Sequence, residues 1–217
     1  RGGPGRGQGS ICLSAMIEKN GLSEYLEGMP VNADTPVQIT WRSLDPSHWA
    51  TELAERCIVA MEDRETVILC ITGKAGSGKS TLGRFIRKQG LPGIPLVKML
   101  VIDDGMAHLK WFGLLPRRIK YRCRTKDYLA PFASHFAGRR LLVYVNTTPE
   151  QRIDRCDILV RLRCADSERR SRLVARDPDG AERFGKGLDQ ADSPRVSAGQ
   201  YFDLQTDHPA MAAFSGR

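Results

Sequence analysis

The sequence contains no apolar run long enough to cross a membrane. Its longest uninterrupted apolar stretches lie at 67–71 and 141–145 and are only as long as a β-strand, whereas a spanning helix needs about 20 predominantly apolar residues. We therefore expect no membrane span in these 217 residues. A hydrophobic content of 41% and a charged content of 27% are instead typical of a soluble globular domain.

Cysteine pairs at metal-binding or redox spacing are also missing. The six cysteines include no C-x-x-C pair, so the sequence gives little support to a zinc or redox site. Cys70 lies inside an apolar run, where a reduced and buried thiol is expected. Reduced thiols favour a cytoplasmic location.

The first part of the chain has weak periodicity. Residues 1–15 lack an initiator methionine and the apolar core of a signal peptide, so we expect a flexible N-terminal extension with Met16 as a candidate natural start. Residues 16–63 are expected to form a helical region packing on the core, with a short helix near 13–27 and an amphipathic helix at 47–62. The second helix is indicated by the capping sequence Asp45-Pro46-Ser47 and by apolar residues at helical spacing, namely Trp49, Leu53, Cys57 and Ala60.

The rest of the chain, 64–217, alternates strand-like and helix-like segments. Continuous apolar runs predict buried strands at 66–71, 96–102, 141–145 and 157–162. A helix is expected at 80–88, between the first two strands. Such alternation is typical of an α/β fold with a mostly parallel central sheet.

A glycine-rich motif joins the first strand to its helix. Gly73, Gly78, Lys79 and Ser80 match every fixed position of the phosphate-binding pattern G-x-x-x-x-G-K-[ST]. Glycines let the backbone curl so that its N–H groups point at phosphate oxygens, and the following helix N-terminus adds partial positive charge. Lys79 would reach the β- and γ-phosphates of ATP, and the Ser80 hydroxyl would ligate Mg²⁺. The expected nucleotide-binding residues are Gly73, Lys74, Ala75, Gly76, Ser77, Gly78, Lys79, Ser80 and Thr81.

Two adjacent carboxylates, Asp103 and Asp104, follow the second expected strand. Ligands in open α/β sheets collect at the carboxyl ends of the strands. A carboxylate there can accept a proton from a substrate hydroxyl or hold Mg²⁺ through water, and we take Asp103 as the candidate metal residue. Adjacent side chains point in different directions, so only one is expected to face the phosphates. A solvated Asp-Asp-Gly turn explains the same residues without any function.

Basic residues are concentrated in two segments of a chain whose net charge is +8. In residues 117–126, positions 118, 120, 122, 124 and 126 are all basic, so an extended backbone would place five cations on one face. That face would suit an anionic small-molecule acceptor or a nucleic-acid backbone. An exposed edge strand kept soluble by cations accounts for the pattern equally well.

The second basic segment follows the last expected strand. Arg169, Arg172 and Arg176 share one face if the segment is helical. Guanidinium groups over a transferring phosphoryl group would neutralise its developing charge, although a solvated charged helix has the same spacing. Residues 177–200 are polar and are expected to form a mobile loop that acts with the arginines as a lid. Residues 201–204 would add a short final element.

Residues 64–177 together resemble small P-loop kinases of the uridine kinase and phosphoribulokinase type. The resemblance rests on the phosphate loop, a strand ending in Asp-Asp, and Asp-Ile-Leu-Val-Arg-Leu followed by an Arg-rich segment ending in Arg-Asp. It implies a three-layer P-loop NTPase fold and a magnesium- and ATP-dependent kinase acting on a small hydroxyl compound. Asp103 or Asp104 would be the base, and Arg172 and Arg176 the lid arginines. The family's aromatic pair is replaced here by Gly105-Met106, and its Glu-Gly by Asn146-Thr147.

Other families share parts of the pattern. The Val101-Ile102-Asp103-Asp104 ending is similar to the catalytic segment of HPr kinases, whose acceptor is a protein serine. Lys74 occupies the position of the signature lysine of ParA- and MinD-like switch ATPases, and residues 146–149 are similar to their D-T-P-P segment. Those proteins dimerise on DNA or membranes and would imply a role in DNA partition or plasmid maintenance. Ala75 and Asn146 depart from that pattern. A nucleotide-binding module without catalysis is a third alternative.

Overall fold

The computed structural model describes residues 39–111, 115–121, 126–188 and 195–214. The expected extension at 1–15 and the expected short helix near 13–27 lie outside these residues, as do positions 122–125 of the basic segment. The described residues belong to one compact unit. None of the helices in the described ranges combines the length and the apolar character that crossing a bilayer requires.

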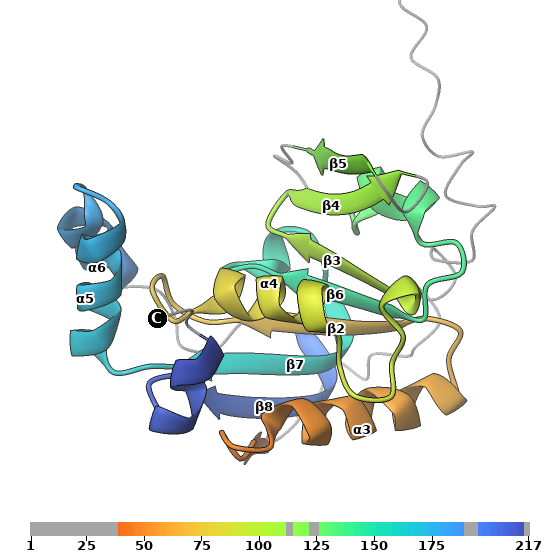
Figure 1. The fold of residues 1–217 in the computed structure, drawn as a ribbon, viewed down its shortest axis with the longest axis horizontal. Coiled ribbons are helices and arrows are strands. Elements are labelled where there is room, and N and C mark those ends of the chain that lie inside the picture. The colour runs from red at the N-terminus through yellow and green to blue at the C-terminus, as the bar shows by residue number, and fades with distance from the viewer. Residues whose placement is uncertain (1–38, 112–114, 122–125, 189–194, 215–217) are drawn as a thin grey trace, which may run out of the picture. The chain divides into compact units, whose positions relative to one another are not determined.

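Eight strands of the described residues form a single sheet in the order β1-β8-β7-β2-β6-β3-β4-β5 (Figure 1). The first six in that order run parallel to their neighbours, and β4 and β5 continue the sheet antiparallel. The predicted α/β fold with a mostly parallel sheet is thus confirmed. The strands are β1 Trp41–Ser43, β2 Val67–Thr72, β3 Met99–Asp103, β4 Met106–Trp111, β5 Leu115–Lys120, β6 Leu141–Val145, β7 Arg155–Arg163 and β8 Ser197–Gln205.

The four strands predicted from apolar runs correspond to β2, β3, β6 and β7. The second was predicted to begin at Leu96, but residues 96–98 form a short 3-10 helix (η2) and β3 begins at Met99. Exposure explains the difference, because Leu96 and Val97 are 48% and 70% exposed and have no place in the buried sheet. The apolar run in the sequence therefore begins before the strand β3 does.

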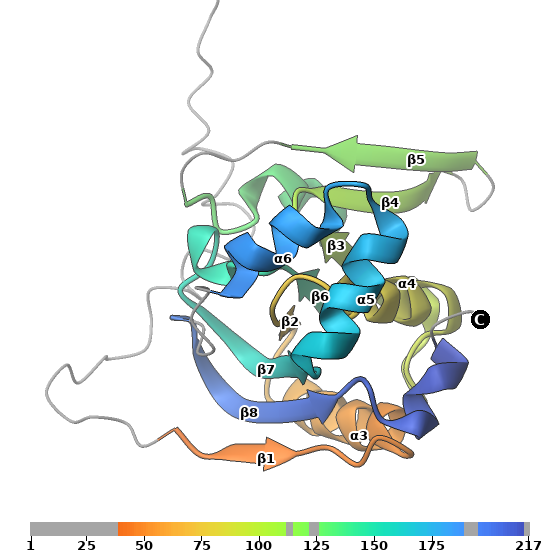
Figure 2. The same cartoon turned by 90° about the vertical axis from the view of Figure 1, so that its left-hand side faces the viewer.

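Helices α3 (Trp49–Glu62) and α4 (Lys79–Gln89) cover one face of the sheet. Figure 2 shows both on the same side of the strands, with the 3-10 segment Ala130–His135 (η3) on the other. The predicted helices at 47–62 and 80–88 are confirmed within two residues. The region before residue 64 also adds a strand, β1, at the sheet edge beside β8. Both helices share one core with alternate residues of β2, including Trp49, Leu53, Cys57, Leu82, Ile86, Val67, Leu69 and Ile71.

Composition predicted a mobile loop at 177–200, but the described residues of this range form regular structure over most of their length. Helix α6 (Gly180–Leu188) follows α5 (Asp166–Arg176), and β8 begins at Ser197, while 189–194 lie outside the described residues. Contacts that the local sequence does not reveal stabilise these elements. A Cβ at Gly180 would lie 2.2 Å from the Leu173 carbonyl oxygen, so only glycine permits this approach of α6 to α5. Residues 201–204 belong to the longer strand β8, which pairs with β7.

Candidate functional site

The loop between β2 and α4 depends on glycine for its shape. Gly73, Gly76 and Gly78 have φ values of 145°, 82° and 92°, a region that residues with a side chain rarely adopt. The chain curls at these points and enters α4 at Lys79. The N-terminus of α4 has no side-chain cap and no acidic residue in its first turn. No residue of the cap or of the first turn therefore neutralises the partial positive charge of this helix end, which favours anion binding.

Helix α5 and the end of β8 hold this loop in place. Arg169 is 1% exposed, and its Nε donates to the Ala75 carbonyl oxygen at 2.9 Å. Its Nη1 pairs with Asp166 at 2.5 Å. The Thr206 hydroxyl donates to the Ser77 carbonyl oxygen at 2.8 Å. Sequence spacing grouped Arg169 with the lid arginines, but its contacts make it an anchor of the loop backbone.

Replacing Arg169 by alanine is expected to lower the free energy of unfolding by about 1.5–3 kcal/mol, because it removes charge-assisted hydrogen bonds from a buried site. Urea denaturation followed by circular dichroism would measure the change. Arg170→Ala is the matched control, since Arg170 is its exposed neighbour on α5. Equal unfolding midpoints for the two variants would contradict the anchoring role.

Lys79 lies within the curve of the loop. Its Nζ donates to the carbonyl oxygens of Gly73 and Lys74 at 2.6 and 2.8 Å, and the residue is only 9% exposed. Burial lowers the pKa of Lys79 to about 8, with Asp103 opposing the shift and Arg169 and Arg176 adding to it. An anion in the loop would favour the charged form of this lysine.

The structure separates the two adjacent carboxylates. The Ser80 hydroxyl donates to Oδ1 of Asp103 at 3.2 Å, so Asp103 faces the start of α4. Asp104 has a left-handed φ of 55°, its N–H donates to the Val145 carbonyl oxygen at 2.7 Å, and it is exposed. Its carboxylate accepts only a long hydrogen bond from Asn146 at 3.5 Å. Of the pair, Asp103 is the residue next to the loop.

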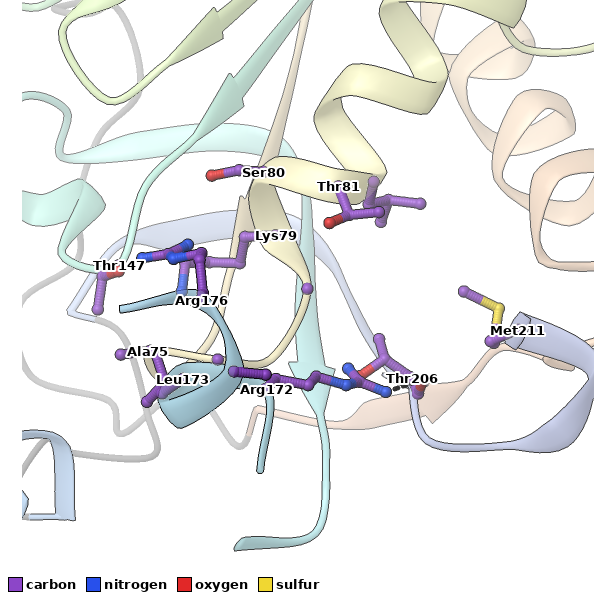
Figure 3. A pocket seen from close by; sticks show the side chains of 14 residues that line it. Ala75, Lys79, Ser80, Thr81, Thr147, Arg172, Leu173, Arg176, Thr206 and Met211 are labelled. Carbon is purple, nitrogen blue, oxygen red and sulfur yellow. Dashed lines mark hydrogen bonds between the residues drawn. The ribbon is translucent and has the colours of Figure 1, made fainter. Parts of the chain in front are cut away.

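A cavity of about 570 Å³ opens beside the loop, a volume within the range of small-molecule sites. Figure 3 shows Arg176 near Lys79 and Thr147, and Arg172 extending toward Thr206. Arg172 is tethered, because its Nη2 donates to the Thr206 carbonyl oxygen at 3.2 Å and its Nε to Glu168 at 2.9 Å. The predicted site residues that line this cavity are Ala75, Gly76, Gly78, Lys79, Ser80, Thr81, Arg172 and Arg176.

Six lining residues were not identified from sequence: Leu82, Thr147, Leu173, Ala175, Thr206 and Met211. Thr147 follows β6 and Thr206 follows β8, so both stand at carboxyl ends of parallel strands. The rule that ligands collect at those ends would have pointed to them once the strands were assigned. Met211 comes from a 3-10 turn after β8, and no sequence signal marks it.

A second, smaller cavity of about 290 Å³ shares Ser80 with the first. Ser80 lines both cavities, and Asp103 lines only the second. One residue of the basic segment, Arg118, reaches it from β5. The predicted alternation holds locally, with Ile119 buried between exposed Arg118 and Lys120. Lys74 and Asp104 line neither cavity. The described lining residues of the second cavity are Ser80, Gly83, Arg84, Arg87, Val101, Asp103, Met106, His108 and Arg118.

A metal ion at this site would need ligands from the nucleotide. The described residues contain no cluster of three His, Cys, Asp or Glu side chains able to hold one alone. The Ser80 hydroxyl and the Asp103 carboxylate are oxygen ligands of the kind that Mg²⁺ prefers, usually beside phosphate oxygens. The donor set therefore fits magnesium bound together with a phosphate group.

The Asn146 side chain is hydrogen-bonded to neighbouring residues of its own segment. Its side-chain oxygen accepts a hydrogen bond from the Thr148 N–H at 3.1 Å, and its Nδ2 donates to the Tyr144 hydroxyl at 2.5 Å. These contacts fix the chain after β6 and position Thr147 at the first cavity.

No protein-family model matches this chain, and the comparison with curated proteins finds none similar to it. Its function is therefore inferred from the geometry of the two cavities and of the loop between β2 and α4.

Proposed function

We propose that the protein is a three-layer P-loop NTPase that binds ATP and acts as a magnesium-dependent kinase, transferring the γ-phosphate to a small hydroxyl-bearing acceptor. One observation carries the proposal. Ser80 and Asp103 are hydrogen-bonded to each other, and Ser80 lines both cavities whereas Asp103 lines only the second. One cavity offers a phosphate cradle, and the other offers room for an acceptor next to a carboxylate.

The residues of the first cavity would hold the triphosphate. Lys79 and the loop amides bind the β- and γ-phosphates, and the Ser80 hydroxyl binds Mg²⁺, which supplies charge neutralisation when bound. Arg176 and Arg172 stabilise the negative charge of the transferring group. Thr81 and Thr206 line the cavity farther from Lys79, toward Met211 (Figure 3).

Asp103 would act on the acceptor. Its carboxylate orients the acceptor hydroxyl and takes its proton as the new oxygen–phosphorus bond forms and the bond to the departing diphosphate breaks. Phosphoryl transfer requires mainly positioning and charge neutralisation, which these residue types supply.

A switch ATPase of the ParA and MinD type is the second candidate. Its support is that Thr147 and Arg176 line the same cavity, so a phosphate bound there would lie next to the segment 146–149. Such a response to bound nucleotide is what a switch needs.

ATP turnover measured with a panel of nucleosides, sugars, phosphorylated metabolites and DNA separates these functions. We expect turnover to rise with a hydroxyl compound that itself becomes phosphorylated. Stimulation by DNA together with ATP-dependent dimerisation would favour the switch ATPase instead. Tight ATP binding without turnover under any condition would leave only a binding module.

A further inference from the structure

Exposed apolar side chains gather where α3 lies beside the segment that follows α4. Ile58 and Val59 belong to α3, and Leu96 and Val97 belong to η2. Each of the four is between 39% and 70% exposed, and together they are half of the eight large apolar side chains that are exposed in the described residues. Single apolar residues on a surface are common, whereas a contiguous group of them marks an interaction site.

Contacts between the elements bring the two pairs of side chains together. A Cβ at Gly93 would lie 3.2 Å from Cδ1 of Ile58, so α3 touches the loop that runs from α4 to η2 (Figure 1). Arg140 joins the end of α3 to η2. Its Nη2 donates to the Met61 carbonyl oxygen at 2.5 Å, and its backbone N–H donates to the Lys98 carbonyl oxygen at 2.8 Å. The four apolar side chains therefore form one surface, which we call the α3–η2 patch.

Charged side chains border the patch with opposite signs on its two halves. On α3, the exposed Glu55 and Glu62 share the face of the apolar residues 58 and 59, because the spacing is i, i+3, i+4 and i+7. On the other half, Lys98 ends η2, and Arg139 donates to a carbonyl oxygen of η2. Among the described residues, none of these four side chains forms an ion pair. Their charges are thus available to a partner.

This arrangement fits a second copy of the same chain. In a two-fold dimer both copies use the same patch, so the acidic α3 half of each copy meets the basic η2 half of the other. The neighbouring exposed Arg56 and Asp63 add one charge of each sign and keep the balance. The whole chain has a net charge of +8, so two copies repel each other over most of their surface. A balanced patch with an apolar centre is where they can approach.

We propose that the α3–η2 patch is the interface of a homodimer, in which Glu62 of each copy pairs with Lys98 of the other. The patch lies at the amino ends of the parallel strands, because α3 leads into β2 and η2 leads into β3. The loop between β2 and α4 follows the opposite end of β2. Dimerisation therefore needs no ATP, which distinguishes it from the ATP-dependent dimerisation of a switch ATPase, and it goes beyond the proposed kinase function.

Sedimentation velocity of the full chain without nucleotide tests the dimer. We expect a Kd on the order of 10 µM, because small interfaces give weak association. Val59→Asp and Val97→Asp should each weaken association at least about tenfold, since each places a carboxylate against apolar side chains at the centre of the interface. Val174→Asp is the matched control, because Val174 is 52% exposed on α5, outside the patch.

Charge reversal identifies the partner. Glu62→Lys and Lys98→Glu each place like charges at both of the proposed contacts, so each variant alone should associate at least about tenfold more weakly than the unsubstituted chain. A one-to-one mixture of the two variants places opposite charges at both contacts and should restore association. Only two copies of this chain can show that recovery, and a mixture that associates no better than its components overturns the proposal.

The remaining outcomes are equally distinct. A chain that stays monomeric up to about 300 µM overturns the proposal. If Val59→Asp and Val97→Asp then also lower the midpoint of urea denaturation, another part of the same chain covers the patch. A dimer that persists in every patch variant uses a different surface and also overturns the proposal. Lys79→Ala should leave the dimer unchanged, so failure of the nucleotide site and failure of the dimer are separate results.

Discussion

Lys79→Ala is expected to abolish detectable ATP binding or to reduce turnover by on the order of 10²- to 10³-fold, as the loss of a buried charge-stabilising donor does elsewhere. The Lys79 ammonium is the cation enclosed by the loop, where burial strengthens its interaction with a phosphate. Isothermal titration with ATP and Mg²⁺, together with kcat/KM, would measure the effect. Unchanged affinity and activity would count directly against the nucleotide site.

Two controls make the Lys79 result specific. Lys88→Ala removes an exposed lysine from the far end of α4 and should leave ATP affinity within about twofold of the starting value. Circular dichroism must show that Lys79→Ala remains folded, because the substitution leaves the Gly73 and Lys74 carbonyls without their donor.

Lys74→Ala separates the two candidate functions. A severe loss of ATP turnover in this variant favours the switch ATPase, and a mild loss favours the kinase.

Asp103→Asn is expected to reduce phosphotransfer about 10²- to 10⁴-fold, the range of a lost general base. Asparagine keeps an oxygen that can accept from Ser80, so the local geometry persists while the proton acceptor is removed. Asp104→Asn should change the rate by less than about threefold. Its side chain is exposed, and asparagine tolerates the left-handed φ of 55° found there.

Single-turnover kinetics with the acceptor compound that the panel identifies would compare the rates of phosphotransfer in the two aspartate variants. ATP affinity, measured separately without Mg²⁺, should change little in either one, because neither aspartate lines the larger cavity. Two silent variants would remove the proposed base. A severe Asp104 variant beside a mild Asp103 variant would show that the wrong carboxylate had been assigned.

The shape of the loop between β2 and α4 could be predicted from sequence because it follows from local rules. Glycines at 73, 76 and 78 adopt backbone angles that other residues disfavour, so the turn is encoded in the residues that form it. The buried strands beside it could be predicted equally well. An unbroken apolar run such as 141–145 is stable mainly in the interior of a sheet that is covered on both faces. Both signals are contained in a few consecutive residues.

Residue roles that depend on contacts with distant parts of the chain could not be predicted from sequence in this way. Arg169 and Arg172 stand one turn apart on α5 and look equivalent in sequence, yet one is buried against the Ala75 carbonyl and the other lines the cavity. The same holds for 177–200, where polar composition concealed α6 and the start of β8. The choice between Asp103 and Asp104 depended on the backbone turn at Asp104.

The attachment of Arg169 to the loop has a consequence for the local unfolding of the protein. A Cβ at Gly76 would lie 2.8 Å from the Arg169 carbonyl oxygen, so the loop and the first turns of α5 are in direct backbone contact as well. Neither segment can unfold locally without exposing polar groups of the other, which makes them one cooperative unit. A bound triphosphate would then slow amide hydrogen exchange in α5 as much as in the loop, although most of that helix never touches the nucleotide.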